Sequence, residues 1–398
     1  MTNEPKNVPE LRFPGFDEEW KLHILGECVT NKTRKFNSKK DDNESDIELD
    51  SLESDTGRLI HLYNSTEFSS QKNRFKKGDV LYSKLRPYLN KYYFADFDGV
   101  CSSEIWVLNS KDKSILKNKF LYSFIQTNKF SFMANKSAGS KMPRADWNLV
   151  ENMRLNLPTV QEQQKIGTFF NKLDRQIELE EQKLEKLKEQ KKGYMQQIFS
   201  RQFLFENEKG DTDYSWRNFK INDIFSKIES GNRLPKTNLV EGNIPYVIAQ
   251  TTNNGVFMHI SEDTLDYHKN KLKLFKKGSI TISIDNPEAM FIQEMDFFTS
   301  NVMRVIHNEN LKRGSHIFIM ESLKKLTQSY NWSVKFSGPI IMDSTVKFPV
   351  YNDNKVNWNV VNKIGDFFNT FEIRINRQSD KIKLLEERKK GFLQKMFV

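Results

Sequence analysis

Residues 162–170 read EQQKIGTFF and residues 363–369 read KIGDFFN, so the chain contains nearly the same helix start twice. Lys165, Ile166, Gly167, Phe169, Phe170 and Asn171 all recur 198 residues later. Unlike sequence of domain length precedes each copy. The repeat predicts two similar halves, each ending in a helix.

Both copies continue as an apolar stripe with coiled-coil spacing. Alternating steps of four and three residues reach mostly apolar side chains, and the polar interruptions fall at the same places in both copies. The stripes are Ile166, Phe170, Leu173, Ile177, Glu180, Leu184, Leu187, Lys191, Tyr194, Ile198 and Ile364, Phe368, Phe371, Ile375, Gln378, Ile382, Leu385, Lys389, Phe392, Met396. One such stripe alone would favour packing on the preceding domain, but two matched stripes favour pairing with each other.

Connectivity predicts antiparallel pairing, because the first helix delivers the chain to its far end, where the second half begins. From Ile166 to Ile198 the pair would extend about 48 Å at roughly 1.5 Å per residue. We expect a mixed α/β fold with two domains at opposite ends of a long antiparallel two-helix coiled coil, related by a pseudo-two-fold axis. The expected boundaries are 1–156 and 213–355 for the domains, 157–201 and 356–398 for the helices, and 202–212 for the linker.

Three details of the helices bear on their ends and contacts, and two of them leave alternatives open. Thr159 and Glu162 form a capping-box pattern, which the second helix lacks because Val360 replaces the glutamate. Lys191 and Lys389 interrupt the stripes, either to set the register or to extend toward solvent. The Lys-Lys-Gly element near each C-terminal end indicates either close approach of another backbone or a frayed last turn.

The segments before the two helices share a turn motif and the strand patterns that follow it. Phe-Lys-Lys-Gly occurs at 75–78 and at 275–278, each time followed by an apolar run typical of a strand. A second strand pattern follows at 103–108 and at 301–306. The two halves therefore follow one α/β plan with different loops, as expected of two recognition domains with different specificities.

Charge suggests a polyanionic partner. The net charge is +10, and eight acids without a base lie between Asp41 and Asp55, which leaves +18 on the rest. We expect this acidic run to be a solvated loop facing away from phosphates; a site for a basic protein is the alternative. Two cysteines, no apolar stretch of about 20 residues and a polar start predict a soluble cytoplasmic protein without membrane contact.

Catalytic patterns are not found. The six histidines lack metal-ligand spacing, and the sequence contains no HExxH, phosphate-binding loop or GxSxG elbow. Residues 285–288 read DNPE, which only superficially suggests the Asn-Pro-Pro-aromatic motif of adenine methyltransferases. We therefore expect a chain that is not an enzyme by itself and that holds neither a metal nor another cofactor.

Basic, amide and aromatic residues gather in a few loops. Arg and Lys can bind guanine edges, Asn can pair with adenine, and basic side chains can anchor phosphates. Taken singly, each residue would more simply be a solvated charge or a turn former; together they predict contact with double-stranded DNA. The candidates are Lys84, Arg86, Tyr88, Asn90, Lys91, Lys141, Arg144, Asn232, Arg233, Lys236, Gln250, Thr251, Thr252, Asn253 and Asn254.

The motif LPxxxEQQKI at 157–166, followed by the apolar stripe, resembles the central helix of DNA-specificity subunits of type I restriction-modification systems. SKLRPYLNK at 83–91 and GVCSSE at 99–104 resemble one class of their target-recognition domains. The likeness spans essentially the whole chain. The second helix start departs from the pattern because it lacks the Glu-Gln pair.

The resemblance implies a non-catalytic subunit that reads an asymmetric bipartite DNA site, with the helices setting the spacer. It also implies two methyltransferase and two restriction subunits as partners, which use S-adenosylmethionine, ATP and magnesium. The implied docking residues are Glu162, Gln163, Phe169, Lys192, Gly193, Phe367, Lys390 and Gly391. The rival interpretations are a coiled-coil adaptor with two peptide-binding heads and a nuclease with a divergent site.

Overall fold

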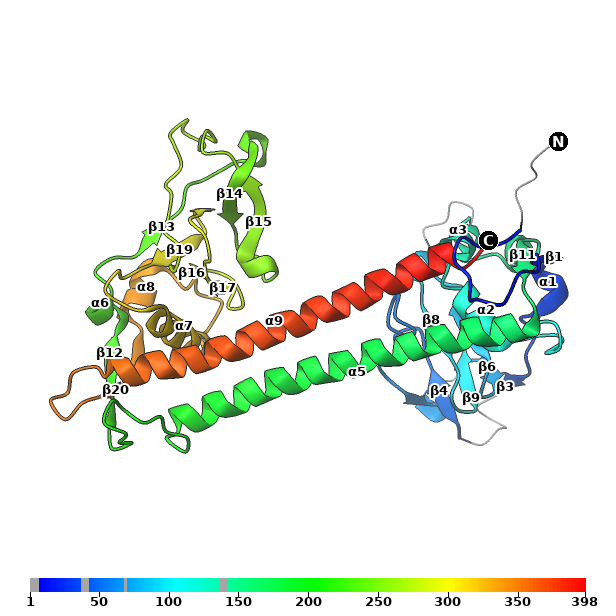
Figure 1. The fold of residues 1–398 in the computed structure, drawn as a ribbon, viewed down its shortest axis with the longest axis horizontal. Helices are drawn as coiled ribbons and strands as arrows, with labels where there is room; N and C mark the ends of the chain where they lie inside the picture. Colours follow the sequence, from blue (N-terminus) through cyan, green and yellow to red (C-terminus); the bar gives the residue numbers. More distant parts are fainter. Residues whose placement is uncertain (1–6, 37–42, 68–69, 137–141) are drawn as a thin grey trace. The chain divides into compact units, whose positions relative to one another are not determined.

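The computed structural model describes residues 7–36, 43–67, 70–136 and 142–398. The chain forms two compact units, and both are mixed α/β (Figure 1). Unit 1 comprises residues 1–183 and 378–398, and unit 2 comprises residues 184–377. The long helices α5 (Val160–Phe199) and α9 (Trp358–Lys395) each contribute to both units.

Unit 1 contains a two-stranded, a four-stranded and a five-stranded sheet. The strand orders are β1-β11, β2-β10-β7-β8 and β3-β6-β9-β4-β5. The strands are β1 (Lys21–Ile24), β2 (Val29–Thr30), β3 (Lys35–Phe36), β4 (Ser45–Ile47), β5 (Tyr63–Asn64), β6 (Lys72–Phe75), β7 (Val80–Ser83), β8 (Tyr92–Phe94), β9 (Gly99–Ser102), β10 (Ile105–Ser110) and β11 (Arg154–Leu157). The short helices are α1 (Leu25–Cys28), α2 (Asn118–Phe124), α3 (Asn128–Ala134) and α4 (Trp147–Glu151), with 3-10 turns η1 (Ser65–Glu67) and η2 (Pro87–Leu89).

Unit 2 repeats the first two sheets with the orders β12-β20 and β13-β19-β16-β17, and adds the three-stranded sheet β15-β14-β18. Its strands are β12 (Ser215–Lys220), β13 (Glu229–Ser230), β14 (Glu241–Val247), β15 (Val256–Ile260), β16 (Ile280–Ser283), β17 (Met290–Ile292), β18 (Phe298–Thr299), β19 (Met303–Ile306) and β20 (Thr345–Val350). Its helices are α6 (Ile221–Ile224), α7 (Arg313–Thr327) and α8 (Gly338–Asp343), with 3-10 turns η3 (Lys236–Asn238) and η4 (Asn253–Gly255). The predicted plan of two similar α/β halves is confirmed by these matching sheet orders.

The repeated helix start belongs to the core of its own unit. Ile166 and Phe170 are buried among the apolar side chains of unit 1, and Ile364 and Phe368 occupy the same position in unit 2. The repeated glycine explains the close packing: a Cβ on Gly167 would lie 2.7 Å from the Lys119 Cβ at the start of α2. The interpretation that the stripe packs on the preceding domain is therefore correct for the first turns.

The ends of the long helices complete the same two cores. Ile198, near the end of α5, is buried in the core of unit 2, while Leu393 and Met396, near the end of α9, are buried in the core of unit 1. The core of each unit thus contains the start of one long helix and the end of the other.

Within each unit, α5 and α9 run antiparallel, as the connectivity predicts. In unit 1, Lys389 pairs with Asp174 at 2.6 Å, and Gln378 donates to a Glu180 carboxylate oxygen at 2.8 Å. In unit 2, Lys191 pairs with Glu372 and, at 3.0 Å, with Glu321 of α7. Both stripe lysines are therefore polar contacts of the helix pair, and extension to solvent is excluded.

The helix starts are capped by equivalent residues. Thr159 Oγ1 accepts from the Glu162 amide at 3.4 Å, and Asn357 Oδ1 accepts from the Val360 amide at 3.2 Å. The Glu162 carboxylate does not complete the predicted capping box, because Arg12 binds both of its oxygens, at 2.7 and 2.8 Å.

Two of the predicted docking residues are corrected by these contacts. Glu162 and Gln163 are fully buried. Glu162 pairs with Arg12, and the Gln163 side chain hydrogen-bonds to backbone groups of Ile115, Lys117 and Pro158. They hold the helix start in unit 1 and offer no surface to a partner. Phe169 and Phe367 are partly buried against aromatic neighbours, Phe392 and Tyr194 respectively.

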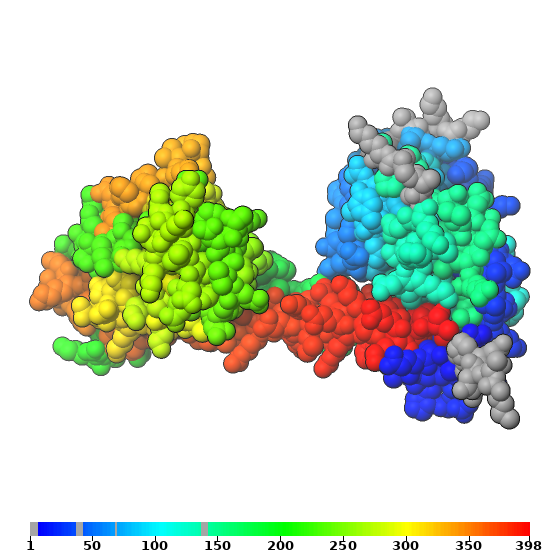
Figure 2. Space-filling view, turned by 90° about the horizontal axis from the view of Figure 1, so that it is seen from above, coloured from blue at the N-terminus to red at the C-terminus, as the bar shows by residue number. Residues whose placement is uncertain are grey.

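The Lys-Lys-Gly elements lie inside regular helix, so the frayed-turn interpretation is wrong. Lys192 and Lys390 are exposed, and a Cβ on Gly193 or Gly391 would meet nothing within 4 Å. On the face that Figure 2 shows, the C-terminal part of α9 is open to solvent.

Replacing Gly365 by alanine should destabilise unit 2. The added Cβ would overlap the backbone of Gly314 at the start of α7, and overpacking of this kind costs about 1–3 kcal/mol. Gly391→Ala is the matched control: its Cβ meets open space, and alanine is favoured in a helix by about 1 kcal/mol. Thermal unfolding should show a lower Tm for the first variant only, and equal Tm values would contradict the packing argument.

Glu180 should make the helix pair sensitive to acid. Hydrogen bonds from Gln378 and then from Lys381 lower the pKa of Glu180 to about 2, below its value of about 4.3 in an unfolded chain. The stabilisation is therefore complete above about pH 4.3 and is lost as the pH falls toward 2. In urea unfolding between pH 2 and 5, Glu180→Gln should flatten this dependence. The exposed-site control Glu185→Gln should retain it, and identical curves for the two variants would refute the assignment.

Candidate nucleic-acid interface

The first candidate loop, residues 84–91, joins β7 to β8 and turns by way of η2. Arg86 and Asn90 flank η2 in the left-handed region, with φ of 51° and 45°. Non-glycine residues rarely adopt this conformation, so the surrounding hydrogen bonds must hold it. The Leu89 amide donates to the Arg86 carbonyl and the Asn90 amide to the Pro87 carbonyl, both at 2.9 Å.

The second candidate segment of this half lies directly beside the loop. The Arg86 amide donates to the Pro143 carbonyl, and the Ala145 amide donates to the Lys84 carbonyl, both at 2.8 Å. Arg86 and Tyr88 are exposed, while Arg144 pairs with Glu104 at 3.0 Å. The structure thus joins the loop and segment 142–145 into one surface; Lys141 lies outside the described residues.

The side chains of Asn90 and Lys91 are held by contacts inside unit 1. The Asn90 side-chain amide donates to Asp55 at 2.9 Å, and the Lys91 ammonium donates to the Leu49 carbonyl at 2.7 Å. Their assignment as direct DNA contacts is corrected: both side chains anchor the acidic run to the loop.

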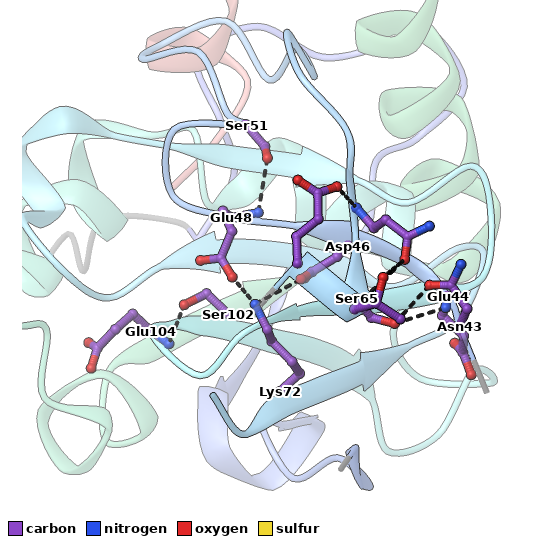
Figure 3. A network of polar contacts seen from close by, with 12 residues as sticks. Asn43, Glu44, Asp46, Glu48, Ser51, Ser65, Lys72, Ser102 and Glu104 are labelled. Carbon is purple, nitrogen blue, oxygen red and sulfur yellow. Dashed lines mark hydrogen bonds and ion pairs between the residues drawn. The ribbon is translucent and has the colours of Figure 1, made fainter. Parts of the chain in front are cut away.

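The acidic run is not the solvated loop that its composition predicts. Asp46 lies in β4, is fully buried and pairs with the equally buried Lys72 of β6 at 2.7 Å (Figure 3). Lys72 also pairs with Glu48, and Glu44 pairs with Arg74. Further along, Arg58 pairs with Glu53 at 2.7 Å and with Glu181 of α5, while the Tyr63 hydroxyl donates to Asp50 at 2.8 Å.

These contacts change the electrostatic argument. Every described acid of the run has a partner inside unit 1. Four of them share the cations Lys72, Arg74 and Arg58, whereas Asp50 and Asp55 bind neutral groups, so the charge of the run is compensated in part. Burial raises the pKa of Asp46, and the Lys72 ammonium opposes that shift. The run serves as a structural part of the five-stranded sheet.

In unit 2, several predicted DNA contacts are used by the fold. Asn232 donates to Asp266 at 3.0 Å and accepts from the Lys273 amide at 3.0 Å. Gln250 donates to the Val256 carbonyl at 2.7 Å, and Asn253 donates to the same carbonyl at 3.1 Å. Gln250 and Asn253 thus shape a local turn, as the turn-forming interpretation expects, whereas Asn232 joins segments that are distant in the sequence.

The remaining candidates of unit 2 lie on its surface. Arg233 covers the Tyr267 ring at 4.8 Å, and Lys236 is exposed on η3. The exposed turn between β14 and β15 holds Thr251, Thr252 and Asn254. The Asn254 carbonyl accepts from Gln293 at 3.0 Å, and the Gln293 amide donates to the carbonyl of Ser279, just before β16. This turn therefore lies near the first residue of β16.

Sequence reasoning missed the loop at the other end of that strand. Residues 284–288 follow β16 as residues 84–90 follow β7. The signal was available, because Phe-Lys-Lys-Gly at 75–78 and 275–278 places the two loops at one offset of 200 residues. Of the aligned loop residues only Pro87 and Pro287 coincide at this offset, and the loop of unit 2 carries no Arg or Lys that would mark it as a DNA contact.

The described residues contain no group of three or more His, Cys, Asp or Glu side chains that could hold a metal ion. Among the helices of the described ranges, none is both long and apolar enough to cross a bilayer.

Comparison with known families agrees with the two-unit plan. The family model "Type I restriction modification DNA specificity domain" matches twice, at residues 17–189 and 214–382. The chain belongs to this family. Each match covers one α/β domain together with much of the long helix that follows it.

Relatives of this specificity family show how far the likeness extends. The chain is 28% identical over 170 residues to the Type I restriction enzyme HindI specificity subunit of Haemophilus influenzae, covering 41% of this chain and 37% of the relative. It is 31% identical over 118 residues to the Type I restriction enzyme EcoDI specificity subunit of Escherichia coli, covering 29% and 26%. The matches thus span less than half of these relatives.

A solved structure of the same family shares the fold. The Type-I restriction-modification system S subunit from M. genitalium aligns with a TM-score of 0.59 at 15% identity, over 98% of this chain and 99% of that one.

In this specificity-family chain, Lys72→Met should destabilise unit 1. It would leave the Asp46 carboxylate buried without its cation, and breaking a buried pair costs about 3–5 kcal/mol. Lys77→Met, at an exposed position after β6, is the control and should change stability little. Urea unfolding of both variants measures the difference. Equal midpoints would mean that Lys72 does not hold the acidic run.

Proposed function

We propose that this chain is the DNA-specificity subunit of a type I restriction-modification complex in the cytoplasm. Each unit reads one half of an asymmetric bipartite site, and α5 and α9 form an antiparallel coiled coil that sets the distance between the halves. The chain itself is not catalytic. Family membership supports the assignment, and the internal repeat supports the bipartite site.

The observation that carries the proposal is that the same helix contacts occur in both units at equivalent residues. Lys389–Asp174 in unit 1 and Lys191–Glu372 in unit 2 are the same pair displaced by 198 residues. The aromatic contact between Phe169 and Phe392 in unit 1 corresponds in the same way to that between Phe367 and Tyr194 in unit 2.

Glu180 and Gln378 are themselves equivalent residues, and they contact each other. A contact between equivalent residues is what an internal two-fold axis requires at its centre. We place the pseudo-two-fold axis of the coiled coil there. The proposed half-site centres are separated by the length of the pair, about 48 Å at roughly 1.5 Å per residue. This corresponds to about 14 base pairs at roughly 3.4 Å per step.

The open helix surfaces suit partner subunits. Lys192 and Lys390 are exposed beside glycines that leave room for another backbone. We propose that two methyltransferase subunits dock there, together with Phe169 and Phe367 at the edges of the pair, and that two restriction subunits complete the complex. S-adenosylmethionine, ATP and magnesium would be bound by those partners.

Selection from randomised DNA tests the function. Full-length chain, purified with any co-purifying subunits, would be incubated with a pool of random duplexes, and the bound fraction sequenced. We expect one asymmetric motif of two short halves around an unspecified spacer, with binding that weakens steeply as salt rises. Salt-insensitive binding or the absence of an enriched motif would contradict the proposal and favour an adaptor for peptides.

Lengthening both helices at the proposed axis should lengthen the spacer. Duplicating residues 177–180 in α5 and 375–378 in α9 adds about 6 Å at roughly 1.5 Å per residue. This is close to two base-pair steps at about 3.4 Å each. The same selection should return unchanged half-sites with a spacer about two base pairs longer. An unchanged spacer would show that the helices do not set its length. Duplication in one helix alone is the control, because it breaks the match between the two helices.

A further inference from the structure

The loop at 284–288 in unit 2 is built on the same frame as the candidate loop at 84–90 in unit 1. The amide of the last residue of each preceding strand closes the loop: Ser83 donates to the Lys91 carbonyl at 2.9 Å, and Ser283 donates to the Ala289 carbonyl at 3.0 Å. The next amide of each loop donates to the residue just before the neighbouring strand. The Lys84 amide donates to the Glu104 carbonyl, before β10, at 3.0 Å, and the Ile284 amide donates to the Val302 carbonyl, before β19, at 3.2 Å.

A third hydrogen bond brings in the flanking segment. The Lys84 carbonyl accepts from Ala145 at 2.8 Å, and the Ile284 carbonyl accepts from Phe336 at 2.7 Å. Segment 333–335 of unit 2 therefore lies where segment 142–144 lies in unit 1. The exposed Lys335 is the counterpart of Arg144.

The side chains on this shared frame differ in hydrogen-bonding character. Arg86 is an exposed donor in the loop of unit 1, whereas Glu288 is an exposed acceptor in the loop of unit 2. None of the ion pairs among the described residues involves Glu288. Asn286 accepts from the Glu288 amide at 3.1 Å and so shapes the turn that presents Glu288.

We infer that residues 284–288 together with Lys335 form the base-reading surface of unit 2, in which Glu288 accepts from a cytosine amino group and Lys335 holds a phosphate. The inference rests on the proposed function. In it, the loop at 284–288, and not the turn at 250–254, contacts the bases of the second half-site. Carboxylates pair with the N4 amino group of cytosine in the major groove, whereas arginine pairs with guanine. The two units thus read different base edges from one backbone frame.

The test is the same duplex selection with single variants of the full chain. Glutamine pairs with adenine, so Glu288→Gln should change one cytosine of one half-site to adenine and leave the other half-site and the spacer unchanged. Lys335→Ala should keep the motif but lower the slope of log affinity against log salt by about one. Arg86→Ala should relax the opposite half-site, which shows that the two halves respond independently.

Glu309→Gln and Lys312→Ala are the matched controls. Both residues are exposed and follow the end of β19. That end lies beside the start of β16, because Ile306 pairs with Ile280, whereas the loop at 284–288 follows the opposite end of β16. They should leave the motif and the salt slope unchanged. The inference is overturned if Glu288→Gln and Lys335→Ala both behave as wild type while the wild-type chain enriches a bipartite motif. If the wild-type chain enriches no motif, the proposed function itself fails, and the inference fails with it.

Discussion

The constraint on which the structure depends is the burial of both ends of each long helix in a domain core. Helix α5 begins in the core of unit 1 through Ile166 and Phe170 and ends in the core of unit 2 through Ile198. Helix α9 begins in the core of unit 2 and ends in that of unit 1 through Met396. Neither core is complete without both helices. This explains why the helix start is repeated, because each domain needs the same insertion of Ile, Gly and Phe into its own core.

Charged contacts give the helix pair its register. The apolar stripe alone would tolerate a shift by one heptad, since its residues are similar along the helix. A shift would separate Lys191 from Glu321 and Glu372, and would leave Glu321, which is 1% exposed, with Lys324 at 3.5 Å as its remaining cationic partner. The same argument applies to Lys389 and Asp174 in unit 1. Direction and alignment therefore follow from polar residues that periodicity alone would count as defects.

The sequence was sufficient to predict the features that depend on local patterns. The repeat, the helix ends to within a few residues and the strands after Phe-Lys-Lys-Gly all follow from spacing, and spacing survives in the fold. The roles of charged and amide residues did not follow, because they depend on partners distant in sequence. Asp46 and Glu162 were misplaced for this reason: Lys72 and Arg12 neutralise them only after folding. Asn232 and Gln250 offered the same chemistry for a contact inside the fold as for a base edge, and only the folded structure shows the internal hydrogen bonds that they make.

The central claim is that one chain reads two different half-sites and thereby directs modification to one asymmetric sequence. Single-molecule methylation sequencing of the source cells, with and without this gene, tests it most directly. The account predicts that deletion abolishes methylation at one bipartite motif with two dissimilar halves, and that the restored gene returns it. Methylation that is unchanged by deletion, or lost only at a symmetric motif, would contradict it.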